Sequence, residues 1–397
     1  MRFLAIANYP SDYRPAHQVF VRALLLEMKT LGAEIEVMAP EPIWNAVKVK
    51  SGFRLAPQFE VRDGLAVYRP RYTTYSQVTL PGGGSTFRWT VRAYSNAARR
   101  QIRTKVGNFD FCFAHFLYPH GYAAVQVARD LRTPAVASLG ESEFQRYETH
   151  YSRREIRDLL ASFSRVITNS PLIKECCVDR YDVPEDRIDV FPNGVNERLF
   201  FPRDQELARR KCGLPLQRPI VGFVGQFTDR KGPLRVLEAI RARPEIGAFF
   251  LGYGPQTPQG PQVLCAKAVR HEEISCWLSS ADIFVLPTLH EGCCNAVLEA
   301  LSCGVPIVSS DLPFNRGLLD EKVAVLVDPK NIGALKRAIF SLLDNPERLS
   351  AMRQACVQKS ASFRLADRAN QIINLLKDHS LTGEKPNIKT KAVCAAT

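Results

Sequence analysis

The decisive stretch of sequence, residues 286–306, reads LPTLHEGCCNAVLEALSCGVP. A buried apolar run leads into it and predicts a strand, and Ala296–Cys303 consists mostly of helix-forming residues. Asn295 is a suitable N-cap, and Gly304 with Pro306 gives the stop signals expected after a helix. The stretch therefore predicts a strand, a loop and a short capped helix, which is a repeating unit of parallel α/β sheets.

Such a helix start can bind an anion, because its first amides lack intrahelical partners and carry partial positive charge. We expect the amides of Ala296, Val297 and Leu298 to face a diphosphate. Glu291 precedes the helix and Glu299 lies one turn inside it, so both carboxylates could accept hydrogen bonds from ligand hydroxyls. The alternative is that both glutamates are solvated, as charged residues usually are. The strand, loop and helix context narrows the gap between this alternative and the functional interpretation.

The alternation of strand-like and helix-like segments extends over most of the chain. A first set of predicted strands occupies 3–7, 34–39, 109–114, 135–139, 165–169 and 188–191. The pattern begins again with strands at 220–225, 248–251, 283–286 and 307–309. The expected fold class is α/β, with two Rossmann-like, doubly wound parallel sheets that face a cleft.

The length of 397 residues suits two domains. A charged, proline-containing stretch at 202–219 marks the join. We assign 1–202 to a first domain, 203–379 to a second domain whose last helix could return to the first, and 380–397 to a disordered tail. Because ligands bind outside the carboxyl ends of parallel strands, the site is expected in the loops that follow the strands.

The composition is that of a soluble globular protein. Hydrophobic residues make up 46% of the chain and charged residues 23%, and no apolar run approaches the ~20 residues of a membrane span. The 11 cysteines show no zinc-ligand spacing, which favours reduced thiols in a cytoplasmic protein. The net charge of +13 indicates an anionic partner.

A basic segment, residues 224–232, follows the first strand of the second set and precedes a predicted helix at 233–241. Its Arg230 and Lys231 would lie at the carboxyl end of the strand, where they could neutralise phosphate. Taken alone, the segment is at least as typical of a solvated turn.

Together these features resemble family-4 glycosyltransferases, which have the two-domain GT-B fold. The resemblance rests on the Glu-x7-Glu pair, on Lys231-Gly232, on FPNGVN at 191–196 and on LGYGP at 251–255. It extends in order over roughly residues 1–375 and implies that 1–202 is the acceptor-side domain and 203–379 the donor-binding domain.

The resemblance implies transfer of a sugar from a nucleotide-sugar donor to a glycan or lipid-linked acceptor, with retention of configuration, in surface polysaccharide or glycolipid synthesis. Glu291 would contact the donor sugar, Glu299 the ribose and Lys231 the diphosphate. No Asp-x-Asp motif occurs, so we expect no metal and no other cofactor. Many relatives have arginine where Gln226 stands, and Arg230 is the residue that could replace that cation.

The first domain contains HFLYPHGY at 115–122, directly after a predicted strand. This segment resembles the family's His-x-x-Tyr-Pro-x-Gly, which implies that His115 lies beside the reacting sugar carbon; His120 is a second acceptor-side candidate. A lone histidine is otherwise often structural. Glu143, in a segment that departs from the family pattern, could bind an acceptor hydroxyl. Another departure is His17-Gln18, where relatives commonly place glycine.

Residues 87–106 predict a basic amphipathic helix, with arginines on a stripe beside its apolar face. The surrounding residues 64–109 contain eight Arg or Lys and no acidic residue. We favour a helix that packs on the sheet and solvates its arginines. The alternative is peripheral contact with anionic lipid on the inner face of the membrane.

Two other functions remain open from the sequence. A nucleotide-sugar epimerase could have the same fold, although we identify no set of acids and bases for it. A basic, non-enzymatic protein could bind membranes or nucleic acid, but the sequence contains no nucleic-acid-binding motif, and we expect no nucleic-acid partner. An epimerase would convert the donor without any acceptor.

Overall fold

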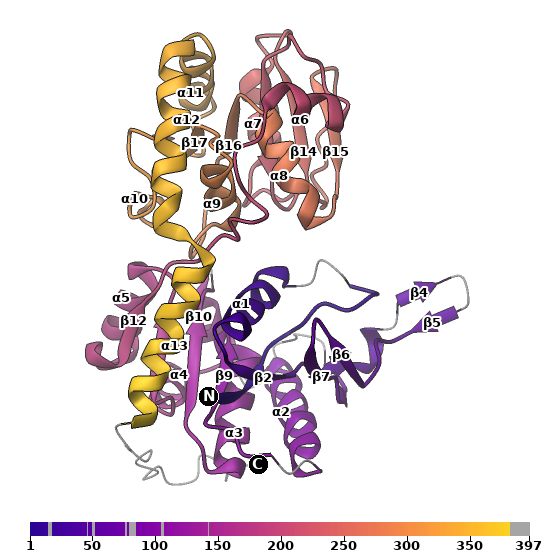
Figure 1. The fold of residues 1–397 in the computed structure, drawn as a ribbon, viewed down its shortest axis with the longest axis vertical. Helices are drawn as coiled ribbons and strands as arrows, with labels where there is room; N and C mark the ends of the chain where they lie inside the picture. The colour runs from indigo at the N-terminus through magenta and orange to yellow at the C-terminus, as the bar shows by residue number, and fades with distance from the viewer. Residues whose placement is uncertain are drawn as a thin grey trace.

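The computed structural model describes residues 1–381 apart from 15–17, 46, 50–51, 76–77, 79–84, 105–106 and 142. The chain forms two α/β lobes, one above the other in Figure 1, each built on one main sheet. The two expected sheets are thus confirmed. The predicted tail 380–397 lies outside the described residues, except for its first two positions, which end the last helix.

The first lobe contains an eight-stranded sheet with the order β12-β11-β10-β9-β1-β2-β7-β6. All neighbouring strands are parallel except β6 and β7, which form an antiparallel hairpin at one edge. The strands are β1 (Arg2–Ile6), β2 (Glu34–Met38), β6 (Phe59–Arg62), β7 (Leu65–Tyr68), β9 (Phe111–His115), β10 (Ala135–Leu139), β11 (Arg165–Thr168) and β12 (Ile188–Val190).

The second lobe contains a six-stranded parallel sheet with the order β15-β14-β13-β16-β17-β18. Its four central strands are buried along their whole length, as expected where helices cover both faces. The strands are β13 (Ile220–Val224), β14 (Gly247–Leu251), β15 (Val263–Lys267), β16 (Ile283–Leu286), β17 (Ile307–Ser310) and β18 (Ala324–Val327).

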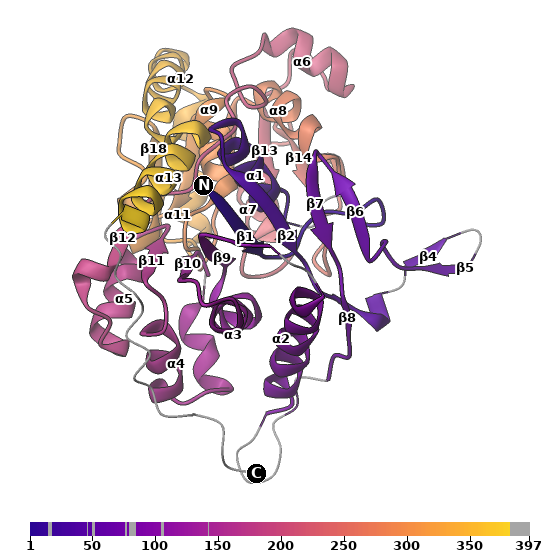
Figure 2. The same ribbon diagram turned by 60° about the horizontal axis from the view of Figure 1, so that its bottom comes forward.

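Helices cover both sheets, and in the first lobe α2 lies beside α3 (Figure 2). Those of the first lobe are α1 (Val19–Thr30), α2 (Phe87–Arg103), α3 (Tyr122–Leu131), α4 (Arg153–Leu160) and α5 (Pro171–Tyr181). Those that follow are α6 (Gln205–Cys212), α7 (Pro233–Ile240), α8 (His271–Ser280), α9 (Asn295–Ser302), α10 (Pro313–Arg316), α11 (Ile332–Leu343), α12 (Pro346–Ser360) and α13 (Leu365–Leu381). Among the helices described, none has the length and apolar character needed to cross a bilayer.

Some short elements were not predicted. The strands β3 (Glu41–Pro42) and β8 (Arg71–Tyr72) pair with each other, as do β4 (Val47–Val49) and β5 (Gly52–Arg54). The β4–β5 ribbon extends away from the body of the first lobe (Figures 1 and 2). Strands of two or three residues carry too little periodicity to be recognised in a sequence.

The last helix, α13, returns to the first lobe, where it packs on α1 (Figure 1). Its apolar face is buried in the same core as β1 and α1; the buried residues are Leu365, Ala369, Ile372, Ile373 and Leu376. The buried Arg368 of α13 donates to the main-chain carbonyls of Phe191 and Pro192. The C-terminal helix therefore fastens the segment that connects the lobes.

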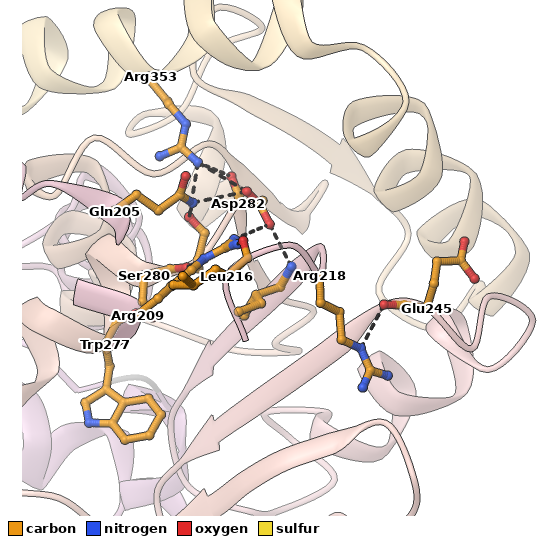
Figure 3. A network of polar contacts seen from close by, with 11 residues as sticks. Gln205, Arg209, Leu216, Arg218, Glu245, Trp277, Ser280, Asp282 and Arg353 are labelled. Carbon is orange, nitrogen blue, oxygen red and sulfur yellow. Dashed lines mark hydrogen bonds and ion pairs between the residues drawn. The ribbon is translucent and has the colours of Figure 1, made fainter. Parts of the chain in front are cut away.

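A polar network fixes α6, just after this connection, to the second lobe (Figure 3). Arg209, only 6% exposed, donates to the carbonyls of Ser280 (3.0 Å) and Leu216 (2.5 Å) and to the Asp282 carboxylate (2.8 Å). The same carboxylate accepts from the Gln205 amide at 3.1 Å. A buried guanidinium is tolerated only when its donors are satisfied in this way, so the network holds the start of the second lobe in place.

Candidate active site

A cavity of about 680 Å³ lies between the lobes and is lined by both. It is open to the loops that follow β9, β10, β13 and β16, which is the carboxyl edge of each sheet. Most of the predicted site residues line it together: His115, His120, Glu143, Lys231, Glu291, Asn295 and Ala296. Arg230, Val297 and Glu299 lie outside this lining.

Two cations converge on the carboxylate of Glu291. Its Oε1 atom lies 2.5 Å from Lys231 Nζ and 3.1 Å from Arg230 Nη1, and it accepts a hydrogen bond from Thr288 Oγ1 at 2.9 Å. The side chains of Lys231 and Glu291 are only 12% and 11% exposed, so solvent screens this pair weakly. Two positive charges against one negative charge leave a net positive charge beside the cavity.

The backbone conformation explains why glycine follows Lys231. Gly232 adopts φ 74° and caps α7, a left-handed conformation that glycine reaches without strain. A Cβ atom there would lie 2.5 Å from the Arg235 guanidinium. The glycine therefore permits the turn that presents Lys231.

The start of α9 differs from the prediction by one residue. The helix begins at Asn295, and the N-cap is Cys294, without a side-chain cap bond; the prediction that Asn295 is the N-cap is wrong. The amides of Val297 and Leu298 donate to the Cys294 carbonyl at 3.1 and 3.2 Å. By helical spacing, the first-turn amides that face the cavity are those of Asn295 and Ala296.

The Asn295 side chain instead joins the lobes. Asn193 Nδ2, in the connecting segment, donates to Asn295 Oδ1 at 2.8 Å and to the Cys293 carbonyl at 3.2 Å. Close by, a Cβ atom on Gly292 would lie 3.1 Å from the Gly140 carbonyl oxygen of the first lobe. The loop that carries Glu291 is thus packed directly on the first lobe, which fixes the width of the cleft.

Glu299 is held by a histidine that sequence reasoning missed. His271 Nε2 lies 2.9 Å from Glu299 Oε1, and the imidazole packs at 5.2 Å from the Phe200 ring. Burial lowers the pKa of His271, but the hydrogen bond and the charge of Glu299 outweigh it, and the pKa is raised overall. No local pattern could link these residues, because His271 begins α8 and Glu299 lies in α9.

His115 ends β9 and is 6% exposed, with Phe20 and Phe116 against its ring. Its Nδ1 atom is buried and accepts or donates no hydrogen bond among the described residues. Burial, with the charges of Arg368 and His120, lowers the pKa of His115 to about 3. The ring is therefore neutral at physiological pH, and an unsatisfied polar atom at a cavity wall indicates a place for a ligand group.

Two backbone conformations at the cavity are unusual. Phe116, next to His115, has φ 74°, and Gln18, at the start of α1, has φ 49°. Non-glycine residues rarely adopt such angles, and they gather at functional sites. Gln18 thus holds, at the start of α1, a left-handed conformation that glycine adopts without strain.

A second missed residue is Glu141. Its Oε1 atom accepts from the Leu117 amide at 2.6 Å and from the Tyr147 hydroxyl at 3.2 Å, and its Oε2 atom accepts from the Gly140 amide at 2.9 Å. Burial raises the pKa of Glu141, against these hydrogen bonds. The side chain joins the loops after β9 and β10, whereas the predicted Glu143 is exposed. A carboxylate directly after a strand was the available signal.

Two family models together match most of the chain. The model of Glycosyltransferase Family 4 matches residues 17–199, and that of Glycosyl transferases group 1 matches 204–359. A Bacillus subtilis protein, TuaC, provisionally named a teichuronic acid biosynthesis glycosyltransferase, is 29% identical over 85% of this chain and 88% of its own. A D-inositol 3-phosphate glycosyltransferase of Thermobispora bispora is 24% identical over 87% and 85%.

Solved structures share the fold. Sucrose-phosphate synthase from Thermosynechococcus elongatus superposes with a TM-score of 0.77 at 19% identity, over 96% of this chain and 99% of its own. Anabaena HepE, solved with UDP-glucose, gives a TM-score of 0.68 at 15% identity, over 95% and 100%. With two family models in sequence order and the two-sheet fold, this chain belongs to the family-4 glycosyltransferases and has the GT-B fold.

Proposed function

We propose that this glycosyltransferase moves a sugar from a nucleoside-diphosphate sugar to a hydroxyl of a glycan or lipid-linked acceptor, with retention of anomeric configuration. The observation that carries the proposal is the shared cavity, where Lys231, Glu291 and the first turn of α9 face His115 of the other lobe. The solved complexes of HepE with UDP and with UDP-glucose support a donor of this class. The TuaC relative supports a role in surface polysaccharide synthesis.

The leaving diphosphate gains negative charge as its bond to the sugar breaks. Lys231, Arg230 and the amides of Asn295 and Ala296 would stabilise that charge, because they are held in place before the reaction. These groups supply the positive charge for which other enzymes use a metal, so we propose that no resident metal is needed. Glu291, which binds both cations, would accept hydrogen bonds from hydroxyls of the donor sugar.

The remaining predicted residues would bind the ends of the two substrates. Glu299 would hold the ribose, and its hydrogen bond to His271 would orient the carboxylate. His115, being neutral, would donate a hydrogen bond to the sugar rather than act as a cation. Glu143 would accept a hydrogen bond from a hydroxyl of the acceptor substrate. His120, which also lines the cavity, would contact the same substrate.

The direct test is thermal unfolding of the full chain with UDP-, GDP- and ADP-sugars in buffer containing EDTA. One nucleotide class should raise the melting temperature by several degrees, because a ligand at 100 times its Kd stabilises the fold by about 2.7 kcal/mol. NMR of the product's anomeric proton should then show retention. A lack of stabilisation by every donor would contradict the proposal, and a new sugar formed from donor alone would favour an epimerase.

We further propose weak peripheral contact with anionic membranes through α2. The helix buries one face, and two of its arginines are paired: Arg88 with Glu155 at 2.5 Å and Arg99 with Asp130 at 2.7 Å. Three other arginines are exposed: Arg92, Arg100 and Arg103. Trp89, 46% exposed, adds an aromatic ring near the start of the helix.

Replacing those three exposed arginines with glutamine should remove most binding to phosphatidylglycerol vesicles. Each basic residue near an anionic surface contributes about 1 kcal/mol, and the attraction weakens as salt is added. Vesicle co-sedimentation at low and high salt measures the effect. If the unsubstituted protein does not sediment with vesicles at low salt, the membrane contact is refuted.

A further inference from the structure

A contiguous series of aromatic rings lines the first-lobe side of the cavity. Tyr118 is stacked on Tyr151 at 4.3 Å and meets Tyr147 at 5.0 Å, while Phe87 lies 6.3 Å from Tyr151 and 4.6 Å from His150. We call these five side chains the aromatic wall. Four of them reach the cavity; Tyr151 lies behind. They belong to α2 and to the turns 117–121 and 144–149 with the residues after them.

Beside the aromatic wall, Arg146 carries a nearly uncompensated charge. Its side chain lines the cavity and is 70% exposed, and the ion pair it forms is with Glu143 at 4.0 Å. By contrast, Arg180 binds Glu148, in the same turn as Arg146, at 2.5 Å. With one carboxylate partner at 4.0 Å among the residues that the structure describes, this guanidinium remains able to bind an anion from the cavity.

His150 adds a neutral donor at the end of the wall. Its Nδ1 atom lies 2.8 Å from Ser85 Oγ, which accepts from the Phe87 amide at 3.3 Å. If Ser85 donates its proton to Nδ1, the neutral ring carries its own proton on Nε2, where it can donate to a ligand. Burial and the charges of Arg146 and Arg88 lower the pKa of His150, in keeping with a neutral ring.

The aromatic wall is continuous with the donor side. Glu141 accepts from the Tyr147 hydroxyl at 3.2 Å, and its own carbonyl oxygen would lie 3.2 Å from a Cβ atom on Gly292. Gly292 directly follows Glu291. The aromatic wall therefore lines the same cavity as Lys231 and Glu291, with Glu141 and Gly292 between them. A molecule seated on the wall would face a sugar held by Glu291.

We propose that the aromatic wall and Arg146 form the acceptor subsite, and that the acceptor is a saccharide bearing an anionic group, either phosphate or carboxylate. The inference rests on the proposed sugar transfer and names the substrate class of the same site. Aromatic faces cover the apolar faces of a sugar ring. The planar guanidinium of Arg146 matches both phosphate and carboxylate, and His150 Nε2–H would donate beside it.

The test measures binding of three probes to the full chain by titration calorimetry: glucose, glucuronate and glucose 6-phosphate. The two anions should bind at least about tenfold more tightly than glucose, the effect of one charge-assisted hydrogen bond. Arg146→Gln should abolish that preference. Arg154→Gln is the matched control, because it removes the same charge from a side chain on α4 that is 83% exposed and lies outside the cavity lining. This variant should retain the preference for the anions.

The outcomes separate the subsite from the proposed function. Equal binding of glucose and both anions, no binding of either anion, or an equal loss in both arginine variants would overturn the subsite. Preference for glucose 6-phosphate identifies phosphate as the group, and preference for glucuronate identifies carboxylate. Stabilisation by a nucleotide-sugar is measured independently in both variants and should be unchanged. Its absence in the unsubstituted protein would refute the donor site instead.

Discussion

Replacing Lys231 with alanine should reduce turnover by about 100-fold or more while the protein stays folded. The side chain of Lys231 is 12% exposed, and its Nζ atom lies 2.5 Å from Glu291 Oε1, in the cavity that the start of α9 also lines. Loss of one preorganised donor to a developing negative charge costs about 100- to 1,000-fold in kcat. The effect should appear in kcat rather than in donor affinity, because the charge on the diphosphate grows in the transition state.

The remaining contacts of Glu291 make this variant interpretable. Arg230 and Thr288 still bind its carboxylate at 3.1 and 2.9 Å, so the buried charge retains partners and the fold should survive. Lys322→Ala, an exposed lysine outside the cavity lining, is the matched control and should leave turnover unchanged. Steady-state kinetics with circular dichroism tests the prediction. Normal kcat in a folded Lys231→Ala protein would exclude this lysine from the mechanism.

Glu291→Ala should also reduce turnover by about 100-fold or more. In the double variant with Lys231→Ala, the loss of turnover should be smaller than the product of the two single losses. The two side chains act as one unit, and effects within such a unit are not additive. Full additivity would mean that the pair at 2.5 Å has no shared role in the reaction.

The strands that form the centre of each sheet could be predicted because they are long, apolar and followed by turn signals. The prediction of β10 was correct to the residue, and that of β13 extended one residue too far. The strand-loop-helix unit around Glu291 could likewise be recognised locally, since its parts are adjacent in sequence. Its cap could not, because Cys294 serves there while the Asn295 side chain binds Asn193 across the cleft.

Contacts between segments far apart in the sequence explain the other differences between the predicted and the observed site. His271 and Glu299 come from different helices, and Glu141 accepts a hydrogen bond from the Leu117 amide, 24 residues earlier in the chain. Such partners are chosen by tertiary packing, which one sequence does not display. The predicted contacts of Glu291 and Glu299 with one ligand stay predictions; of the two, Glu291 lines the cavity and Glu299 does not. Glu299 lies one turn deeper in α9, 8% exposed, where His271 can reach it.

His115→Ala should also lower turnover by about 100-fold, and its pH behaviour distinguishes a neutral donor from a cation. Because the pKa of His115 is lowered to about 3, the ring stays neutral over the pH range in which the enzyme can be assayed. Its titration should therefore contribute no limb to the kcat profile near pH 6 to 7, the usual range of histidine. His115→Asn, which keeps a hydrogen-bond donor, should recover part of the loss.

The same shift makes His115 a source of acid sensitivity. Between pH 3 and about 6.5 the unfolded chain binds a proton that the folded chain excludes. Folding stability should therefore fall as pH drops below about 6.5 and should be independent of this group above it. Urea unfolding at pH 5 and pH 7.5 measures the difference, which should shrink in His115→Asn. An acidic limb near pH 6.5 in the unsubstituted enzyme that vanishes in His115→Asn would show instead that the ring ionises, and the neutral-donor role would have to be given up.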